Sequence, residues 1–340
     1  MNKLTKYGVS ALCGSLAAIS SAHAGDLTVT GGVDVTWVSL DDETTGNPVG
    51  MGSNLTFKGS GELDNGWSVA LSVAHLNANG YSNTNVVIGI PGIGDVRIDQ
   101  GTSGTGIDRM DDKTPVVWEE AYGTGLGTGI DTVAGVSGAA NIEITPSAFM
   151  PDGLTTRFAY SPNAGGGSSV ADKASSGTTA SAKRSGWDLT FSASSDLLGV
   201  DGLSVYGGVS EIDQYENNAA IAGDISEQTL GATYAVGSFT VGYQWSEEDT
   251  GRASTNLKYT NEGYGITFQV NDDLSIGYNH YESDLDTTTD VTAEASSIQA
   301  SYTMGGATLT IAEASADNMK YQTGAAYQRD ATTVKLALAF

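Results

Sequence analysis

The chain has 340 residues, a length that allows two domains or one large all-β unit. Asp and Glu number 40 against 15 Lys and Arg, so a nucleic-acid partner is not expected, because such proteins normally present a basic face. A mean hydropathy of −0.14 is too polar for a bundle of membrane helices, and a single cysteine excludes a disulfide scaffold and a multi-cysteine metal site.

Residues 1–24 have the pattern of a secretory signal peptide. Lys3 and Lys6 form a positive start, an apolar stretch covers residues 7–19, and Ala22 and Ala24 make a small-x-small cleavage site. The apolar stretch is too short to span a bilayer as a helix, although an uncleaved N-terminal anchor is the alternative. Removal of the segment takes two lysines, no acid and the only cysteine, so the net charge changes from −25 to −27.

From residue 27 onward the hydrophobic period is two, which is typical of β-strands with one apolar face. Within residues 27–39 that face holds Leu27, Val29, Val33, Val35 and Trp37. The alternation recurs at 54–63, 67–74, 154–161, 187–192, 203–210, 230–245, 266–278, 298–311 and 334–340. A further strand is expected somewhere in 129–146, and the apolar parity changes between Tyr259 and Tyr264.

Two kinds of connection alternate along the chain. Short connections rich in Gly, Asn, Asp or Pro lie at 64–66, 91–94, 151–153, 236–237, 271–273 and 305–306. Longer, mostly acidic connections lie at 41–50, 162–185, 211–226, 247–255, 283–294 and 316–332. A membrane barrel explains this alternation, because its short turns face the periplasm and its long loops face outside.

The sequence therefore predicts an all-β, transmembrane antiparallel β-barrel of about sixteen strands in residues 25–340. Lipid cannot hydrogen-bond backbone groups, so a spanning sheet must close on itself. Aromatic residues near the predicted strand ends match the interfacial girdles of such barrels: Trp67, Tyr234 and Phe239 by short turns, and Trp187 and Trp245 by long loops. A secreted β-sandwich or β-solenoid is the alternative, but it does not explain a terminal Phe340 on an apolar face.

Three segments carry a resemblance to a known family. The alternating end of the chain, residues 333–340, resembles the C-terminal signature of Gram-negative outer-membrane proteins, which ends in Phe and is recognised by the barrel-assembly machinery. Residues 154–163 (LTTRFAYSPN) look like the R-Y-x-S-P strand of general bacterial porins, and residues 94–98 are similar to the porin strand before the constriction loop. The string P-E-F-G-G of that loop is lacking.

The resemblance to the general porins implies an outer-membrane homotrimer of sixteen-stranded barrels for passive diffusion of small hydrophilic solutes and ions. It also implies that the third long loop folds inward, here the insert at about residues 101–129. We expect its acids to form one side of the constriction: Asp108, Asp111, Asp112, Glu119 and Glu120. By parity, the opposing basic residues of the wall are Lys58, Arg97, Arg157 and Lys335, because a lipid-facing cation near the midplane costs roughly 2–4 kcal/mol.

The excess of acid predicts a negative potential at the channel mouth and a preference for cations that fades at high salt. Alternatively, the acids lie on outer loops and bind divalent cations that bridge lipopolysaccharide. The expected partners are outer-membrane lipid and lipopolysaccharide, the barrel-assembly machinery, further copies of the chain, and small solutes and ions.

No enzymatic activity, cofactor or metal site is predicted. His75 and His280 are the only histidines left after cleavage, and both lie near predicted strand ends. Two alternatives to a general porin are a substrate-specific channel and a non-conducting structural or adhesive barrel. Specific sugar channels often line their pore with aromatics, whereas most aromatics here fall on the predicted lipid face, with Tyr206, Tyr281 and Tyr321 as possible exceptions.

Overall fold

The computed structural model describes residues 24–41, 46–77, 81–101, 104–130, 132–165, 183–215, 220–253, 258–286 and 291–339. The predicted signal peptide lies outside these residues except for Ala24, with which the first strand begins, and the terminal Phe340 lies outside them too. Within the described residues, no helix is long and apolar enough to cross a membrane.

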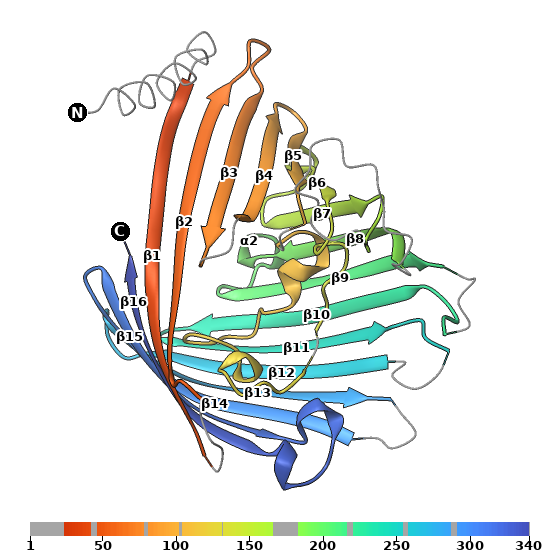
Figure 1. Ribbon diagram of the computed structural model, residues 1–340. Helices are drawn as coiled ribbons and strands as arrows, with labels where there is room; N and C mark the ends of the chain where they lie inside the picture. Colours follow the sequence, from red (N-terminus) through yellow and green to blue (C-terminus); the bar gives the residue numbers. More distant parts are fainter. Residues whose placement is uncertain are drawn as a thin grey trace, which may run out of the picture.

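Sixteen antiparallel strands form one closed barrel in which each strand pairs with its neighbours along the chain (Figure 1). The strands are β1 (Ala24–Leu40), β2 (Val49–Glu62), β3 (Ser68–Leu76), β4 (Tyr81–Ile90), β5 (Gly94–Asp99), β6 (Asn141–Thr145), β7 (Leu154–Ser161), β8 (Lys183–Ala193), β9 (Leu203–Gln214), β10 (Ile225–Val236), β11 (Phe239–Asp249), β12 (Lys258–Gln269), β13 (Leu274–Leu285), β14 (Val291–Met304), β15 (Ala307–Asp317) and β16 (Arg329–Ala339).

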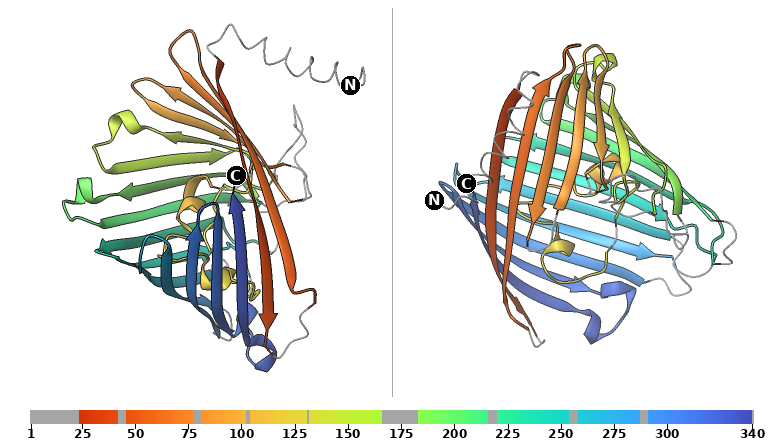
Figure 2. Two further views of the ribbon diagram at one scale, coloured as in Figure 1. Left: turned by 90° about the vertical axis from the view of Figure 1, so that its left-hand side faces the viewer. Right: turned by 45° about the horizontal axis from the view of Figure 1, so that its top comes forward.

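The barrel closes between its first and last strands. β1 pairs with β16 from Gly32 opposite Ala339 to Leu40 opposite Ala331. Figure 2 shows the red β1 beside the blue β16. Closure leaves no unpaired sheet edge at this seam, as a sheet surrounded by lipid requires.

The two faces of the sheet differ in polarity as the alternation predicted. Large apolar side chains are exposed on the outer face, among them Trp37, Phe57, Leu230, Phe239 and Ile298. The alternate positions face inward, and many of the buried ones are polar: Asp188, Thr190, Gln244, Asn279 and Gln299. An apolar outside and a polar inside are the reverse of a soluble domain and are typical of outer-membrane barrels.

The connections alternate as predicted between short turns and longer segments. The strand expected within 129–146 is the short β6, and a one-turn helix, α2 (Ser195–Leu198), lies in the turn between β8 and β9. The predicted loop 283–294 is shorter than expected, because β13 runs to Leu285 and β14 starts at Val291. Pairing continues there through Thr292, whose hydroxyl donates to Asp284 at 2.5 Å.

The change of apolar parity in β12 is not a bulge. β12 pairs with β11 and β13 without a register shift. Tyr264 is exposed on the outer face, whereas Tyr259 lies at an inward position with its ring centroid 5.5 Å from that of Tyr321. The parity changes because an aromatic residue near the end of the strand faces the inside of the barrel.

Candidate functional site

A long segment between β5 and β6, residues 100–140, lies against the inner wall of the barrel. We call it the inner segment, and Figure 1 shows it in orange to yellow within the barrel. It carries two short 3₁₀ helices, η1 (Gly106–Met110) and η2 (Ala121–Gly123). Its apolar side chains Ile107, Met110, Leu126, Val133 and Val136 are at most 2% exposed. The segment is therefore held by burial as well as by polar contacts.

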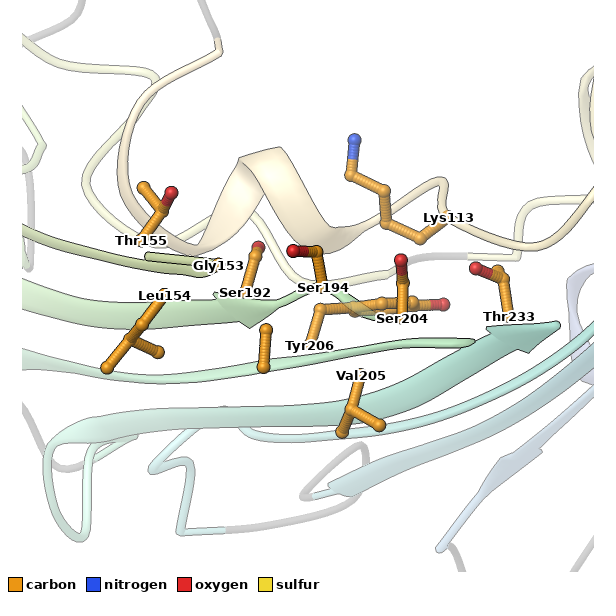
Figure 3. Close-up of a pocket in the computed structure, with 11 residues that line it drawn as sticks. Lys113, Gly153, Leu154, Thr155, Ser192, Ser194, Ser204, Val205, Tyr206 and Thr233 are labelled. Carbon is orange, nitrogen blue, oxygen red and sulfur yellow. The ribbon is translucent and has the colours of Figure 1, made fainter. Parts of the chain in front are cut away.

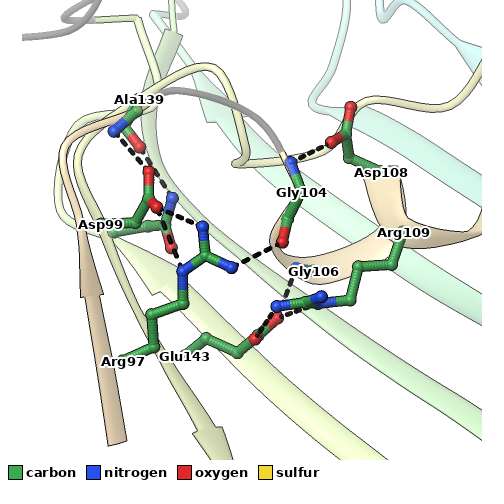
Figure 4. Close-up of polar contacts among 10 residues, drawn as sticks. Arg97, Asp99, Gly104, Gly106, Asp108, Arg109, Ala139 and Glu143 are labelled. Atoms are coloured by element: carbon green, nitrogen blue, oxygen red, sulfur yellow. Dashed lines mark hydrogen bonds and ion pairs between the residues drawn. The ribbon is translucent and has the colours of Figure 1, made fainter. Parts of the chain in front are cut away.

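Two arginines hold the start of the inner segment (Figure 4). Arg97 on β5 pairs with Asp99 at 2.5 Å and donates to the carbonyl oxygen of Gly104 at 3.1 Å. Arg109 on η1 makes a two-pronged contact with Glu143 on β6, at 2.6 and 3.0 Å. Such bidentate pairs fix orientation as well as charge. Arg97 and Arg109 therefore anchor this segment rather than standing free in the lumen.

Three carboxylates occupy one level of the inner wall. Cross-strand pairing runs from Glu143 on β6 through Ala159 to Asp188 on β8, and then through Ser210 to Glu227 on β10. All three acids are at most 5% exposed. We call them the carboxylate row. Small residues between them leave room for the inner segment to approach the wall.

The carboxylate row accepts hydrogen bonds from the backbone of the inner segment. Glu143 accepts the N–H of Gly106 at 2.8 Å, and Asp188 accepts the N–H groups of Ile107 and Val136 at 3.0 and 3.2 Å. Glu227 accepts the N–H groups of Ala134 and Gly135, at 2.9 and 2.7 Å. The carboxylates satisfy donors that would otherwise be buried without a partner.

Glycine is required where the inner segment meets Asp188. Gly106 and Gly135 both have φ of +58°, and a Cβ on either would overlap the Asp188 carboxylate. The carboxylate row was not among the predicted site residues. Its only signal in the sequence is three acids at inward strand positions, and their alignment depends on the cross-strand register.

Amide side chains hold the segment on the opposite part of the wall. Gln244 on β11 accepts the N–H of Lys113 at 3.2 Å, and Asn279 on β13 accepts that of Ala121 at 2.6 Å. Gln299 on β14 accepts the N–H of Trp118 at 2.9 Å. Beyond them, Arg329 and Thr333 on β16 donate to backbone carbonyls of Leu126 and Thr124. The inner segment thus makes contacts from β6 to β16.

The structure places the five predicted acids in different surroundings. Asp108 accepts the backbone N–H of Gly104 at 2.5 Å and so shapes the segment itself. Asp112 is exposed, Asp111 and Glu119 are half-buried, and Glu120 is buried. Asp111, Asp112 and Glu119 are therefore partly or fully open to solvent.

The four predicted basic residues also differ in their surroundings. Lys58 is exposed on the inner face of β2, whereas Arg97 is paired as described above. Arg157 on β7 is half-buried, and the positive charge of Arg109 repels it. Lys335 on β16 lies 5.0 Å from the ring centre of Trp118 and beside Glu119, on the side of the acids rather than opposite them.

Two hollows border the inner wall. The larger, about 600 Å³, lies over β1–β5 and is lined by Thr28, Lys58, Ser60, Ser72, Asn85 and Arg97. The second, about 380 Å³, is shown in Figure 3 and is lined by Lys113 and by the wall residues Thr155, Ser192, Ser204 and Thr233. Among the described residues, no group of three or more His, Cys, Asp or Glu could hold a metal ion. Hydroxyls and single charges suit hydrated solutes.

Two acids of the inner segment should make the channel pH-dependent. Burial, together with the charge of Asp112, raises the pKa of Glu120 to about 7 and that of Asp111 to about 8. Both groups therefore become charged only as the pH rises through this range, at a cost in stability, because the folded state binds their protons more tightly. We expect cation preference, measured as reversal potential, to increase from about pH 6 to about pH 9.

A matched variant tests this assignment. Glu120→Gln should remove part of the pH-dependent change while leaving the reversal potential at about pH 6 unaltered. Equal pH profiles for the variant and the unmodified protein would contradict a role for Glu120.

The fold of the chain is similar to that of solved porins. No curated protein sequence matches the chain. Among solved structures, OmpF of Salmonella typhi in complex with daunomycin is similar with a TM-score of 0.69 and 13% identity, over 93% of this chain and 98% of that one. An anion-selective porin from Comamonas acidovorans has a TM-score of 0.67 and 15% identity, over 93% and 99% of the two chains. OmpT of Vibrio cholerae has a TM-score of 0.64 and 11% identity, over 92% of this chain and 97% of that one.

At these identities the solved structures establish the fold, and the family match establishes the relationship. The Gram-negative porin family matches residues 8–320, which is most of the chain. The matched region includes fifteen of the barrel's strands and the whole inner segment. The chain therefore belongs to the Gram-negative porin family, whose barrels form channels in the outer membrane.

Proposed function

We propose that this protein is a general porin through which small hydrophilic solutes and ions diffuse passively, with a preference for cations. The observation that carries the proposal is that the inner segment lies against the inner wall of a closed barrel with a polar lining, beside a hollow of about 600 Å³ over β1–β5. A lumen lined by hydroxyls, amides and charges favours hydrated solutes over apolar ones. No cofactor and no enzymatic activity belong to this proposal.

The preference for cations rests on the uneven distribution of charge. Asp111, Asp112 and Glu119 lie at or near the surface of the inner segment, whereas Arg97 and Arg109 are neutralised by Asp99 and Glu143. The net charge of −27 after removal of residues 1–24 adds a negative potential that enriches cations at the mouth. A structural neighbour is described as anion-selective, so the fold alone does not determine the sign.

The inward aromatics favour a general channel over a sugar-specific one. Tyr206 and Tyr281 are 5% and 3% exposed, with hydroxyls bonded to Gln244 and Thr114. The hydroxyl of Tyr321 bonds to Ser283 at 2.8 Å. Tyr206 and Tyr281 are thus packed within the wall and are not available as a surface along which a sugar could slide.

Assembly and export complete the proposal. Residues 1–24 act as a cleaved signal peptide, and the end of the chain at Phe340 is recognised by the barrel-assembly machinery. The mature protein forms homotrimers in contact with lipopolysaccharide. These statements rest on the sequence pattern and on the resemblance to general porins.

Single-channel recording of the refolded protein in a planar bilayer tests the function. We expect stepwise openings, commonly in groups of three, and a cation-selective reversal potential under a KCl gradient. An anion-selective reversal would retain the channel but contradict the cation preference and point to Lys58 and Arg157. A folded barrel without conductance would contradict the porin function and favour a structural or adhesive role.

A further inference from the structure

Two glycines on neighbouring strands lie directly under the inner segment. Gly242 on β11 and Gly265 on β12 are cross-strand partners, and both occupy inward positions. The residue above them is Pro115, which follows the buried Thr114 in the inner segment. A pair of opposed glycines presents only backbone to whatever approaches the sheet.

The contacts with Pro115 leave no room for a side chain on either glycine. A Cβ at Gly242 would lie 2.5 Å from Cδ of Pro115, and a Cβ at Gly265 would overlap its carbonyl oxygen. A third inward glycine, Gly277 on β13, would place its Cβ 2.7 Å from Cγ2 of Val117. Residues 115–117 therefore lie directly on the backbone of three adjacent strands.

Two tyrosines border this patch and hold it from both sides. Tyr206 lies over Gly231 on one side, and Tyr281 lies over Gly263 on the other. The Tyr281 hydroxyl bonds to Thr114, next to Pro115, and the Tyr206 hydroxyl bonds to Gln244 at 3.1 Å. Aromatic rings that cover strand glycines restore packing that the glycines lack. The patch is thus bordered by packed tyrosine rings, and Pro115 lies on its glycines.

We infer that Gly242 and Gly265 form a seat for Pro115 that sets how far the inner segment stands out from the wall, and hence the width of the channel. The inference builds on the proposed porin function. With residues 115–117 flush against β11–β13, the larger hollow remains open on the other side, over β1–β5 beside Lys58. A methyl group on the seat would push the segment toward that open space. The two glycines are positioning residues and do not themselves contact solute.

The two seat positions should respond differently to a second change. Gly242→Ala and Gly265→Ala should both lower the single-channel conductance. Pro115→Ala removes the ring carbons that obstruct position 242, so it should restore the conductance of Gly242→Ala. It leaves the carbonyl oxygen that obstructs position 265, so it should not restore that of Gly265→Ala. Gly59→Ala is the control, because a Cβ at Gly59 meets nothing within 4 Å.

Thermal unfolding provides a readout that does not depend on conduction. The Gly242→Ala and Pro115→Ala changes in Tm should be non-additive, whereas those of Gly265→Ala and Pro115→Ala should add. Additive effects at 242, or Gly242→Ala channels of unchanged conductance, would overturn the seat. A further outcome is that neither the unmodified protein nor any variant conducts, while the Tm changes of Gly242→Ala and Pro115→Ala are still non-additive. In that case the seat stands and the proposed function fails.

Discussion

Replacing Asp188 with alanine is expected to release the inner segment and cause a large loss of stability. Asp188 is 0% exposed and accepts two backbone N–H groups, from Ile107 and Val136, which lie at opposite ends of the segment. Each buried donor left without a partner costs about 1–3 kcal/mol. The channel should then show a lower Tm and much larger open-channel current noise.

The matched variant Asp188→Asn retains a carbonyl oxygen of the same reach and should preserve the fold and a quiet current. Asp272→Ala, at an exposed position in a short turn, controls for loss of an aspartate elsewhere. If Asp188→Ala channels were as quiet and as stable as unmodified ones, the hydrogen bonds of this residue could not be what holds the segment.

Neutralising the exposed face of the inner segment should produce the largest change in ion selectivity. At about pH 9, where Asp111 is charged, the variant Asp111→Asn, Asp112→Asn, Glu119→Gln removes three negative charges from the inner segment while Lys58, Arg157 and Lys335 remain. We expect the reversal potential under a KCl gradient to shift toward anion selectivity, because the fixed charge of a constriction determines which ion is concentrated there.

Salt dependence separates this electrostatic effect from a change of shape. The shift should be large at 0.1 M KCl and small at 1 M, since the Debye length falls from about 10 Å to about 3 Å. The control variant Asp272→Asn, Asp273→Asn removes two acids from a short turn that is distant in sequence from the inner segment. It should change the reversal potential little. A similar shift from that control would assign selectivity to overall charge instead of the inner segment.

The β-barrel could be predicted from local pattern alone. Alternation of apolar and polar residues in β10 and β11 fixes which face meets lipid, because a shift by one residue would reverse every side chain. The strands on either side of the predicted short turns at 236–237 and 305–306 end and begin at those turns, as expected. Pattern was least informative in β6, whose five residues alternate but are too few to locate the strand, and which lies between the inner segment and a short 3₁₀ turn.

Parity alone also misjudged the environment of several charged side chains. It places Lys58, Arg97, Arg157 and Lys335 on the inner face, but it cannot distinguish a free charge from a paired one. Arg97 pairs with Asp99 two residues away on the same strand, and Lys335 lies beside Trp118 of the inner segment. Which charges remain free depends on where the inner segment lies against the wall, and its sequence has no periodicity that predicts this.

By itself, the sequence determined the barrel and its lipid-facing side, because these follow from period-two polarity and from turn residues acting over a few positions. That the long insert folds inward was expected only from the resemblance to general porins. The tertiary structure alone decided how the insert is held. Glu143, Asp188 and Glu227 reach one level only through the register of five strands, and Gly242 faces Gly265 only through the pairing of β11 with β12. Such contacts join residues far apart in the chain, so no local pattern encodes them.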